Sequence, residues 1–373
     1  MELNELREKI NSVDEALLPL FLKRMQLSDE VANTKKEKGL SVYNAKRERE
    51  ILSWVTRESG DMDDYARLFF NNLFELSRSR QIQLMSADRP EIIPPETGET
   101  FPSSAVVACQ GIDGAYSQLA ADKVFRFADI MFMKTFDGVF QAVEKGLCRF
   151  GVLPIENSAH GSVTKVYDLM RSHQFSIVRA IKLHIHHHLM AQKGTKLSEI
   201  KTVISHEQAI GQCSIFLEGL KNVKIRICEN TAVAAQLVAD SKDPTIAAIS
   251  SEECAQQYNL EILRSQIQNT DNNYTRFIVI EKTSRVYPGS NKISLMFSLP
   301  NTPGSLGRIM SRFSSCNLNL SKLESRPVEG TDFHYVFYTD LEASAGDPVV
   351  RRLIDGLSRE LPMFVFLGAY QEV

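Results

Sequence analysis

The sequence lacks the features that would place the protein on nucleic acid or in a membrane. Its 373 residues carry a formal net charge of −3, so they offer no general excess of lysine and arginine for a phosphate backbone or an anionic lipid surface. No apolar run approaches the roughly 18 residues that a membrane span requires. The first residues, MELNELREKI, do not form a signal-peptide pattern. We therefore expect a cytoplasmic protein with no nucleic-acid or membrane partner.

Paired cysteines are also missing. The six cysteines are scattered, none forms a Cys-x-x-Cys pair, and each lies in or beside an apolar run, as expected of reduced core thiols. The segment LHIHHHLM gathers four histidines, but strand alternation would divide them between two faces and no cysteine or carboxylate lies beside them. A polar strand is the favoured interpretation, a metal site is the less favoured one, and we expect no bound metal.

The chain is long enough for two or three domains, and its texture changes twice. Residues 1–89 predict helices, the first with a heptad seam that favours packing against another copy of the chain. Pro19 predicts a kink in that helix. Residues 90–104 contain four prolines and no periodicity, which predicts a linker. The predicted seam residues are Leu3, Leu6, Ile10, Val13, Leu17, Leu20, Leu27 and Val31, with Arg24 among them.

Two further domains are predicted downstream. Residues 105–284 alternate short apolar strands with polar loops and helices, a pattern typical of doubly wound α/β folds. Ligands of such folds bind beyond the carboxyl ends of the strands. The stretch QNTDNNYTRFIVIEK then brings a cluster of polar residues to the mouth of an apolar strand. Residues 291–373 predict a βαββαβ, ferredoxin-like unit.

Cations of the first helix are the first candidates for chemistry. Arg24 and Lys35 are eleven residues apart, which returns them to nearly the same helix face at about 100° per residue. An arginine on an apolar seam needs an anionic partner. Arg7 lies about 100° away from Arg24 by the same arithmetic, so one straight helix does not bring all three to one ligand. A partner chain would have to supply Arg7.

The first 85 residues resemble the all-helical chorismate mutases. The resemblance rests on LREKI, LFLKR, VANTKKEKG, NAKRERE and LSRSRQ. In that family, cations within an intertwined helical dimer clamp the two carboxylates of chorismate. Two positions depart from the family pattern: Pro19 lies inside the long helix, and Asn44 stands where relatives often have aspartate. The implied substrate-binding residues are Arg7, Arg24, Lys35, Arg47, Glu48, Ser77 and Gln81.

Residues 105–283 resemble the prephenate dehydratases through five motifs in order, GIDGAYS, PIENSAHGSV, SHEQAIGQC, NTAVAA and NNYTRF. Family members fold as two α/β lobes around a cleft. The resemblance implies loss of CO2 and the ring hydroxyl from prephenate, with the hydroxyl of Thr275 assisting the departing oxygen through a close hydrogen bond. The other implied catalytic residues are Glu156, Asn157, Ser158, Ser205, His206, Gln212 and Phe277.

The sequence leaves the role of Arg276 open. An ideal strand would point it away from the side that Thr275 and Phe277 share, so a substrate contact and a structural ion pair are equally compatible with the sequence. Glu207 stands where the family usually has proline, and it adds negative charge near the site proposed for a dianion.

The last unit resembles ACT regulatory domains through NTPGSLGRIM and KLESRP. In such domains an amino acid binds at a domain interface, and phenylalanine is the implied effector. Ser305 replaces the alanine that is usual in the family. The implied effector-binding residues are Asn301, Gly304, Ser305, Leu306, Glu324, Ser325, Arg326 and Pro327.

Together the three resemblances predict a cytoplasmic homodimer or tetramer that converts chorismate to prephenate and then to phenylpyruvate under inhibition by phenylalanine. Neither step requires a metal or an organic cofactor. Two alternatives stay open. In one, the protein is a prephenate or arogenate dehydratase whose helical module only dimerises. In the other, it is a non-catalytic sensor of an amino acid or another ligand.

Overall fold

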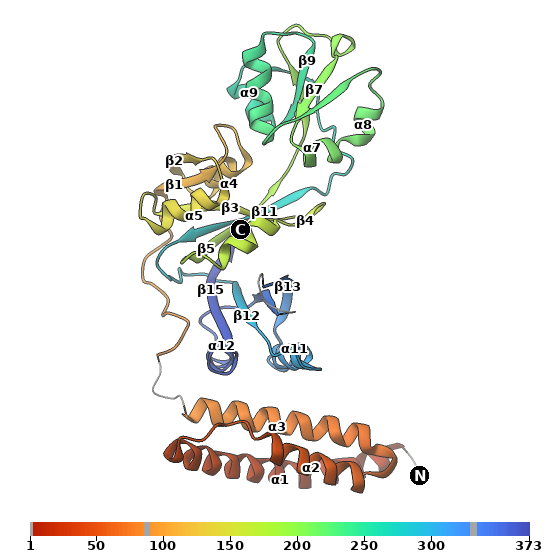
Figure 1. Ribbon diagram of the computed structural model, residues 1–373, viewed down its shortest axis with the longest axis vertical. Coiled ribbons are helices and arrows are strands. Elements are labelled where there is room, and N and C mark those ends of the chain that lie inside the picture. Colours follow the sequence, from red (N-terminus) through yellow and green to blue (C-terminus); the bar gives the residue numbers. More distant parts are fainter. Residues whose placement is uncertain (1–2, 86–89, 329–333) are drawn as a thin grey trace. The chain divides into compact units, whose positions relative to one another are not determined.

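The computed structural model describes residues 3–85, 90–328 and 334–373 (Figure 1). The chain divides into two compact units. The first contains Met1–Ile92, Ser298–Pro300 and Arg351–Phe364, and the second contains Ile93–Phe297, Asn301–Val350 and Val365–Val373. Within the described ranges, no helix combines the length and apolarity needed to cross a membrane.

The N-terminal part of the first unit is helical, as predicted. Asn44 begins the second helix, because its side-chain oxygen accepts a hydrogen bond from the backbone N–H of Arg47 at 3.1 Å. The first helix is continuous through Pro19, so the proline does not interrupt it. The helices are α1 (Leu3–Lys38), α2 (Ala45–Glu58), the 3-10 turn η1 (Gly60–Met62) and α3 (Asp63–Met85).

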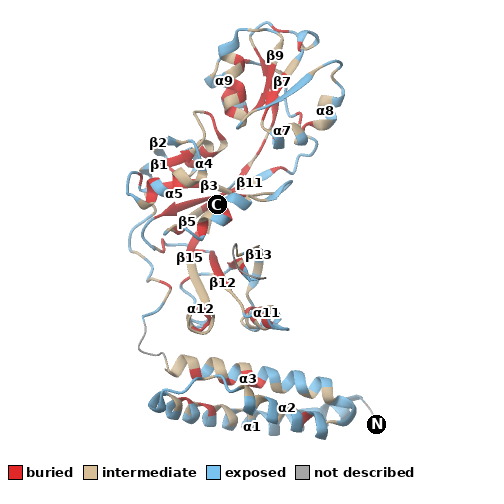
Figure 2. Ribbon diagram, viewed as in Figure 1, coloured by how far each residue is buried: buried red, intermediate tan, exposed pale blue. Residues whose placement is uncertain are grey.

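The predicted apolar seam of α1 is not covered by the helices of its own chain (Figure 2). The buried residues of α1 are Ser28 and Ala32, which belong to the side that meets α3. Exposed apolar surface of this extent is unusual in a monomer and is typical of an interaction face. The exposed seam residues are Leu3, Leu6, Ile10, Val13, Leu17, Leu20, Leu27 and Val31.

The second unit begins with a mixed sheet whose strand order is β5-β11-β3-β1-β2. Strands β1, β2 and β3 run parallel, whereas β11 lies antiparallel between β3 and β5. The strands are β1 (Ser104–Gln110), β2 (Phe127–Met133), β3 (Phe150–Asn157), β4 (Gly161–Ser162), β5 (Ser176–His184) and β11 (Tyr274–Glu281). The helices are α4 (Tyr116–Val124), α5 (Phe136–Glu144) and α6 (Thr164–Met170).

A second sheet follows, with the order β10-β6-β9-β7-β8. The chain enters it after β5 and returns from it into β11, so the two sheets form the two lobes that the family resemblance implied. Its strands are β6 (His188–Ala191), β7 (Thr202–Ser205), β8 (Lys224–Ile227), β9 (Ile246–Ser250) and β10 (Glu261–Arg264). Its helices are η2 (Leu197–Glu199), α7 (Glu207–Gln212), α8 (Ser214–Glu218), α9 (Thr231–Ser241) and α10 (Glu252–Gln257).

The C-terminal elements have the predicted βαββαβ sequence and the strand order β13-β14-β12-β15. Their bounds are β12 (Lys292–Ser298), α11 (Ser305–Ser315), β13 (Asn319–Pro327), β14 (Tyr335–Glu342), α12 (Pro348–Glu360) and β15 (Met363–Glu372). The sequence predicts that the strand containing Tyr335 begins at Phe333, which lies outside the described residues.

Strand β15 joins the C-terminal strands to the first sheet by pairing parallel with β5, Gln371 opposite Arg179 and Glu372 opposite Ala180. Gly368 makes the approach possible: it has a φ of +152°, and a Cβ added there would lie 2.0 Å from the carbonyl oxygen of Ile177. The result is one continuous ten-stranded sheet.

Candidate active sites

The helical unit gathers polar side chains between α1 and α3. Arg24 donates through Nη1 to Ser77 Oγ at 2.7 Å and to the carbonyl oxygen of Leu73 at 3.2 Å. Lys35 Nζ donates to Gln81 Oε1 at 3.1 Å, and Gln81 Nε2 donates to Ser28 Oγ at 3.0 Å. Burial lowers the pKa of Arg24. These contacts make a cationic and amide-bearing strip inside an otherwise apolar bundle.

Glu48 lies at the border of this strip, where its carboxylate pairs with Arg78. Burial lowers the pKa of Lys35, and the carboxylate of Glu48 opposes that shift. Arg78 and Ser28 were not predicted from the sequence, because their roles depend on which faces of α1, α2 and α3 meet. The available signal for Ser28 was its spacing of seven residues from Lys35, which returns it to nearly the same helix face.

Two predicted residues of this site lie elsewhere in the single chain. Arg7 and Arg47 are exposed, and Arg47 forms an ion pair with Glu50 at 3.4 Å. The chain by itself therefore brings together Arg24, Lys35, Glu48, Ser77 and Gln81, and it does not bring Arg7 or Arg47 to them.

The α/β domain forms a compact amide cluster where β3, β11 and α7 meet. Thr275 lies directly opposite Asn157 in the antiparallel pairing of β11 with β3. Asn157 Nδ2 donates to Thr275 Oγ1 and to Asn273 Oδ1, both at 2.9 Å. Gln212 accepts from Asn273 Nδ2 at 3.1 Å, and its own Nε2 lies 3.4 Å from Asn157 Oδ1. The sequence-predicted residues Thr275, Asn157 and Gln212 are thus brought together.

Asn273 and His187 complete this amide cluster and were not among the predicted site residues. Asn273 is 1% exposed, and His187 Nε2 lies 2.6 Å from Gln212 Oε1. The signal for Asn273 was its place in the NNYTRF motif. The signal for His187 was the histidine-rich segment, where the sequence showed imidazoles without showing what they contact. Among the described residues, no group of three or more His, Cys, Asp or Glu side chains is arranged to hold a metal ion.

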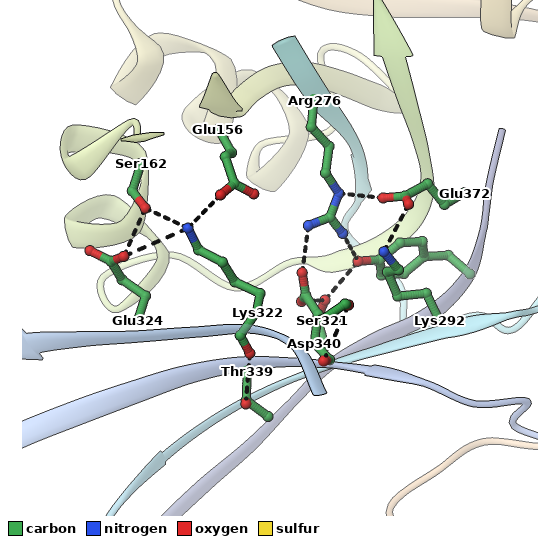
Figure 3. A network of polar contacts seen from close by, with 12 residues as sticks. Glu156, Ser162, Arg276, Lys292, Ser321, Lys322, Glu324, Thr339, Asp340 and Glu372 are labelled. Carbon is green, nitrogen blue, oxygen red and sulfur yellow. Dashed lines mark hydrogen bonds and ion pairs between the residues drawn. The ribbon is translucent and has the colours of Figure 1, made fainter. Parts of the chain in front are cut away.

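The next register pair along the same two strands serves the opposite face. Arg276 lies opposite Glu156, and both side chains contact the C-terminal strands β13, β14 and β15 (Figure 3). Arg276, 7% exposed, pairs with Asp340 and Glu372 at 2.5 Å each and donates to the hydroxyl of Tyr370 at 2.7 Å. Although burial by itself would lower the pKa of Arg276, Tyr370, Asp340 and Glu372 together raise it. The structure thus shows Arg276 in a buried ion pair, one of the two roles left open by the sequence.

Glu156 is held by Lys322 of β13 at 2.7 Å, and the same ammonium contacts Ser162 Oγ at 2.7 Å (Figure 3). Two predicted effector residues lie along the same strand. Ser162 Oγ also donates to Glu324 Oε2 at 2.7 Å, and Arg326 pairs with Asp168 at 3.1 Å. Glu156 and Arg276 therefore lie one residue from the amide cluster in sequence but contact the C-terminal strands.

The remaining predicted catalytic residues make other contacts. Ser158 fixes the start of β11, donating to the carbonyl oxygen of Asn272 at 2.8 Å and accepting from the N–H of Tyr274 at 2.9 Å. Ser205 is fully buried and donates to the carbonyl oxygen of Ile249 at 2.7 Å. His206 caps the helix that ends with Gln212, and Phe277 is buried in the core of the first lobe. Among the hydrogen bonds of the described residues, none joins any of these four side chains to the amide cluster.

The predicted effector residues fall into two groups. Residues 301–306 form the loop before α11 and the first residues of that helix. Gly304 has a φ of +80°, and the hydroxyl oxygens of Thr302 and Ser305 are hydrogen-bonded at 2.8 Å. Residues 324–327 lie on β13. All residues of both groups are among those that the structure describes. No hydrogen bond or ion pair within this chain joins one group to the other.

Comparison with known proteins matches both predicted enzyme domains. The prephenate dehydratase family model matches residues 107–285, and the chorismate mutase type II model matches residues 6–82. The bifunctional chorismate mutase/prephenate dehydratase of Escherichia coli K12 is 31% identical over 373 residues, covering 98% of this chain and 95% of that protein. The chain therefore contains two enzyme domains, and it belongs to the bifunctional chorismate mutase/prephenate dehydratase family.

Two further relatives bear on substrate and effector. Arogenate dehydratase/prephenate dehydratase 1 of Arabidopsis thaliana is 34% identical over 370 residues, covering 89% of this chain and 93% of that protein. A crystal structure of the prephenate dehydratase of Arthrobacter aurescens in complex with L-Phe is 29% identical and has a TM-score of 0.64. It aligns with 71% of this chain and 89% of that one.

Breaking the buried ion pair of Arg276 is expected to destabilise the second unit strongly. Asp340→Ala removes one of its two carboxylates, and we predict a loss of about 3 kcal/mol in the free energy of unfolding, because a buried charge is left undercompensated. Asp168→Ala breaks the more exposed pair with Arg326 and is expected to cost less than about 1 kcal/mol.

Urea unfolding of the full chain separates these effects. The only tryptophan, Trp54, lies in the helical unit, so its fluorescence reports that unit while circular dichroism reports the whole chain. We expect Asp340→Ala to shift the dichroism transition and to leave the fluorescence transition in place. Equal shifts for Asp340→Ala and Asp168→Ala would contradict the assignment.

Proposed function

We propose that the protein catalyses two consecutive reactions of phenylalanine biosynthesis at the two sites described above. The observation that carries the proposal is that each matched enzyme domain holds its own polar cluster: the strip between α1 and α3 in one, and the amide cluster in the other. Chorismate is rearranged to prephenate at the first, and prephenate loses CO2 and its ring hydroxyl at the second to give phenylpyruvate.

The helical site suits a rearrangement that needs no nucleophile. A pericyclic reaction is accelerated by holding the substrate in a reactive conformation and by stabilising the charge that develops. Arg24 and Lys35 supply positive charge beside the substrate carboxylate and the ether oxygen. Their lowered pKa values reflect burial, and burial strengthens each interaction that these cations make with an anion. Gln81 adds a directed amide.

The amide cluster suits departure of the ring hydroxyl. Thr275 Oγ1 accepts from Asn157, which leaves the hydroxyl proton of Thr275 for donation to the leaving oxygen. Formation of the aromatic ring drives loss of CO2, so the protein must mainly orient the ring and assist the oxygen. Thr275 is the group that touches the departing atom, while Asn157 and Gln212 hold its surroundings.

Phenylalanine is the proposed effector of the second reaction. Support comes from the dehydratase relative solved in complex with L-Phe and from the βαββαβ unit of this chain. Glu324 and Arg326 already contact Ser162 and Asp168, so an amino acid bound at these residues has to exchange those contacts. Because Lys322 on the same strand holds Glu156, a shift of β13 is transmitted to the residue beside Asn157.

The proposed assembly contains at least two copies of the chain. The exposed apolar seam of α1 is most simply covered by the same surface of a second copy, because self-complementary interfaces are the rule in homodimers. In such a dimer Arg7 of one chain completes the site that contains Arg24 of the other. The exposed position of Arg7 in the single chain agrees with this arrangement.

Arogenate is a second candidate substrate for the dehydratase site, favoured by the 34% identity to the Arabidopsis protein whose name includes it. The comparison of kcat/KM for prephenate and arogenate on the same enzyme preparation decides between the two substrates.

Selective loss of one activity is the first functional prediction. Arg24→Ala should lower kcat/KM for chorismate by roughly 100-fold or more and leave prephenate turnover unchanged, because a charged donor is lost from only one site. Thr275→Val should lower prephenate turnover by roughly 100-fold or more and leave chorismate turnover unchanged.

Matched controls accompany both variants. Arg80→Ala removes an arginine that pairs with Asp29 on the outside of the same bundle, and Thr195→Val removes a buried hydroxyl that has no partner among the described residues. Both controls should retain both activities. If Arg24→Ala keeps full chorismate turnover, the helical module only dimerises. If the parent protein turns over neither substrate, the sensor interpretation prevails.

Subunit complementation is the second functional prediction. The variants Arg7→Ala and Arg24→Ala, each inactive as a mutase alone, are mixed after reversible dissociation. Every mixed dimer contains one site with both arginines intact and one site with neither. Each mixed dimer should therefore show about half the mutase activity of a wild-type dimer. No recovery, in a mixture shown to contain mixed dimers, would contradict the shared site.

A further inference from the structure

His187 is a buried imidazole that the proposed chemistry has not yet used. It is 2% exposed, its Nε2 atom lies 2.6 Å from Gln212 Oε1, and its Nδ1 atom has no hydrogen-bond partner among the described residues. Buried polar atoms without partners are uncommon, so the burial of His187 with an unpartnered Nδ1 needs an explanation. The hydrogen bonds of the amide cluster supply one, because their directions follow from the backbone.

Asn157 fixes the direction of the first hydrogen bonds in the amide cluster. Its Oδ1 atom lies 3.0 Å from the backbone nitrogens of both Ala159 and His160. A backbone N–H can only donate, so this atom of Asn157 must be the oxygen. The other amide atom is therefore the NH2 group, and its two hydrogens go to Thr275 Oγ1 and Asn273 Oδ1.

The donors of the remaining hydrogen bonds follow from Asn157. Asn273 Oδ1 accepts from Asn157, so the NH2 group of Asn273 is the donor to Gln212 Oε1. Gln212 Oε1 is then an acceptor only, and the nitrogen of His187 that faces it must carry a hydrogen. His187 is thereby fixed as the Nε2–H tautomer, with the lone pair on the unpartnered Nδ1.

We propose that His187 is a positioning residue of the dehydratase reaction, whose Nε2–H holds Gln212 and thereby the Asn273 and Asn157 amides that present Thr275 as a hydrogen-bond donor. The inference rests on the proposed role of Thr275. His187 does not touch the substrate; it acts through Gln212. The backbone supports its position, since its N–H donates to Gln268 Oε1 at 3.1 Å and its carbonyl oxygen accepts from the N–H of Ile267 at 2.9 Å.

The electrostatic surroundings keep this imidazole neutral. Burial lowers the pKa of His187 to about 4, the hydrogen bond to Gln212 opposes this shift, and the neighbouring His188, His186 and His160 reinforce it. At neutral pH the ring therefore carries one hydrogen, and the bond to Gln212 determines where that hydrogen lies. A charged ring would need a second acceptor at Nδ1, which the described structure does not provide.

Two substitutions of the full-length protein test the role. His187→Phe keeps a planar ring and removes the donor, whereas His187→Gln places an amide NH2 where Nε2 was. For prephenate we expect His187→Phe to lower kcat between about 10-fold and 100-fold with KM changed less than about 2-fold, because Thr275 is misoriented rather than substrate binding lost. His187→Gln should recover most of kcat.

His186→Phe is the matched control, since His186 carries the adjacent imidazole and, in the part of the chain that the structure describes, that ring makes no hydrogen bond to the amide cluster. It should reduce kcat far less than His187→Phe. An equal loss in both, or a His187→Gln variant no better than His187→Phe, would show that packing rather than the donated hydrogen matters and would overturn the proposal. Chorismate turnover measured in the same samples should be unchanged in all three.

The tautomer is measured directly on the unmodified protein, which keeps the test independent of folding defects and of activity. Nitrogen-15 spectra of histidine-labelled protein, with the His187 signals assigned by their absence in His187→Gln, should show a protonated Nε2 and an unprotonated Nδ1 from pH 8 down to about pH 5. The Nδ1–H tautomer, or a charged ring in that range, would overturn the inference. Absence of prephenate turnover in the parent protein would instead refute the proposed function.

Discussion

The antiparallel pairing of β3 with β11 is the constraint on which the rest of the α/β domain depends. Adjacent residues of a strand point to opposite faces, so two consecutive register pairs serve different purposes. Thr275 and Asn157 form one pair and join the amide cluster, while Arg276 and Glu156 form the next and join the C-terminal strands. A slip of one residue in this register would exchange the two sets of side chains.

The two proposed sites use different electrostatics because their reactions make different demands. In the helical site, Arg24 and Lys35 provide the positive charge at which we propose that a rearranging dianion is held and stabilised. The amide cluster is built from neutral groups: Asn157 donates to Thr275 and to Asn273, and Gln212 Oε1 accepts from Asn273 and from His187. Lys322 and Arg276 are committed to carboxylates on the opposite face, which preserves the neutrality of the cluster.

Motif order and strand alternation predicted much of this arrangement, but contacts between distant segments could not be predicted. The sequence brought Thr275, Asn157 and Gln212 into one hypothesis and indicated that Arg276 points away from Thr275. It did not place Glu156 against Lys322, because 166 residues separate them and their strands meet through long-range contacts such as the pairing of β15 with β5. His187 was missed for the same reason, since its importance lies in its contact with Gln212.

We propose that the pair of β3 and β11 carries chemistry on one face and communication with the C-terminal strands on the other. The most direct test of this proposal is a phenylalanine titration of prephenate turnover in the parent protein and in Lys322→Met, with phenylalanine binding measured calorimetrically in both. We expect phenylalanine to inhibit the parent protein. Lys322→Met should bind phenylalanine but retain most of its prephenate turnover when phenylalanine is saturating. Equal inhibition of the two proteins, or a parent protein indifferent to phenylalanine, would contradict the proposal.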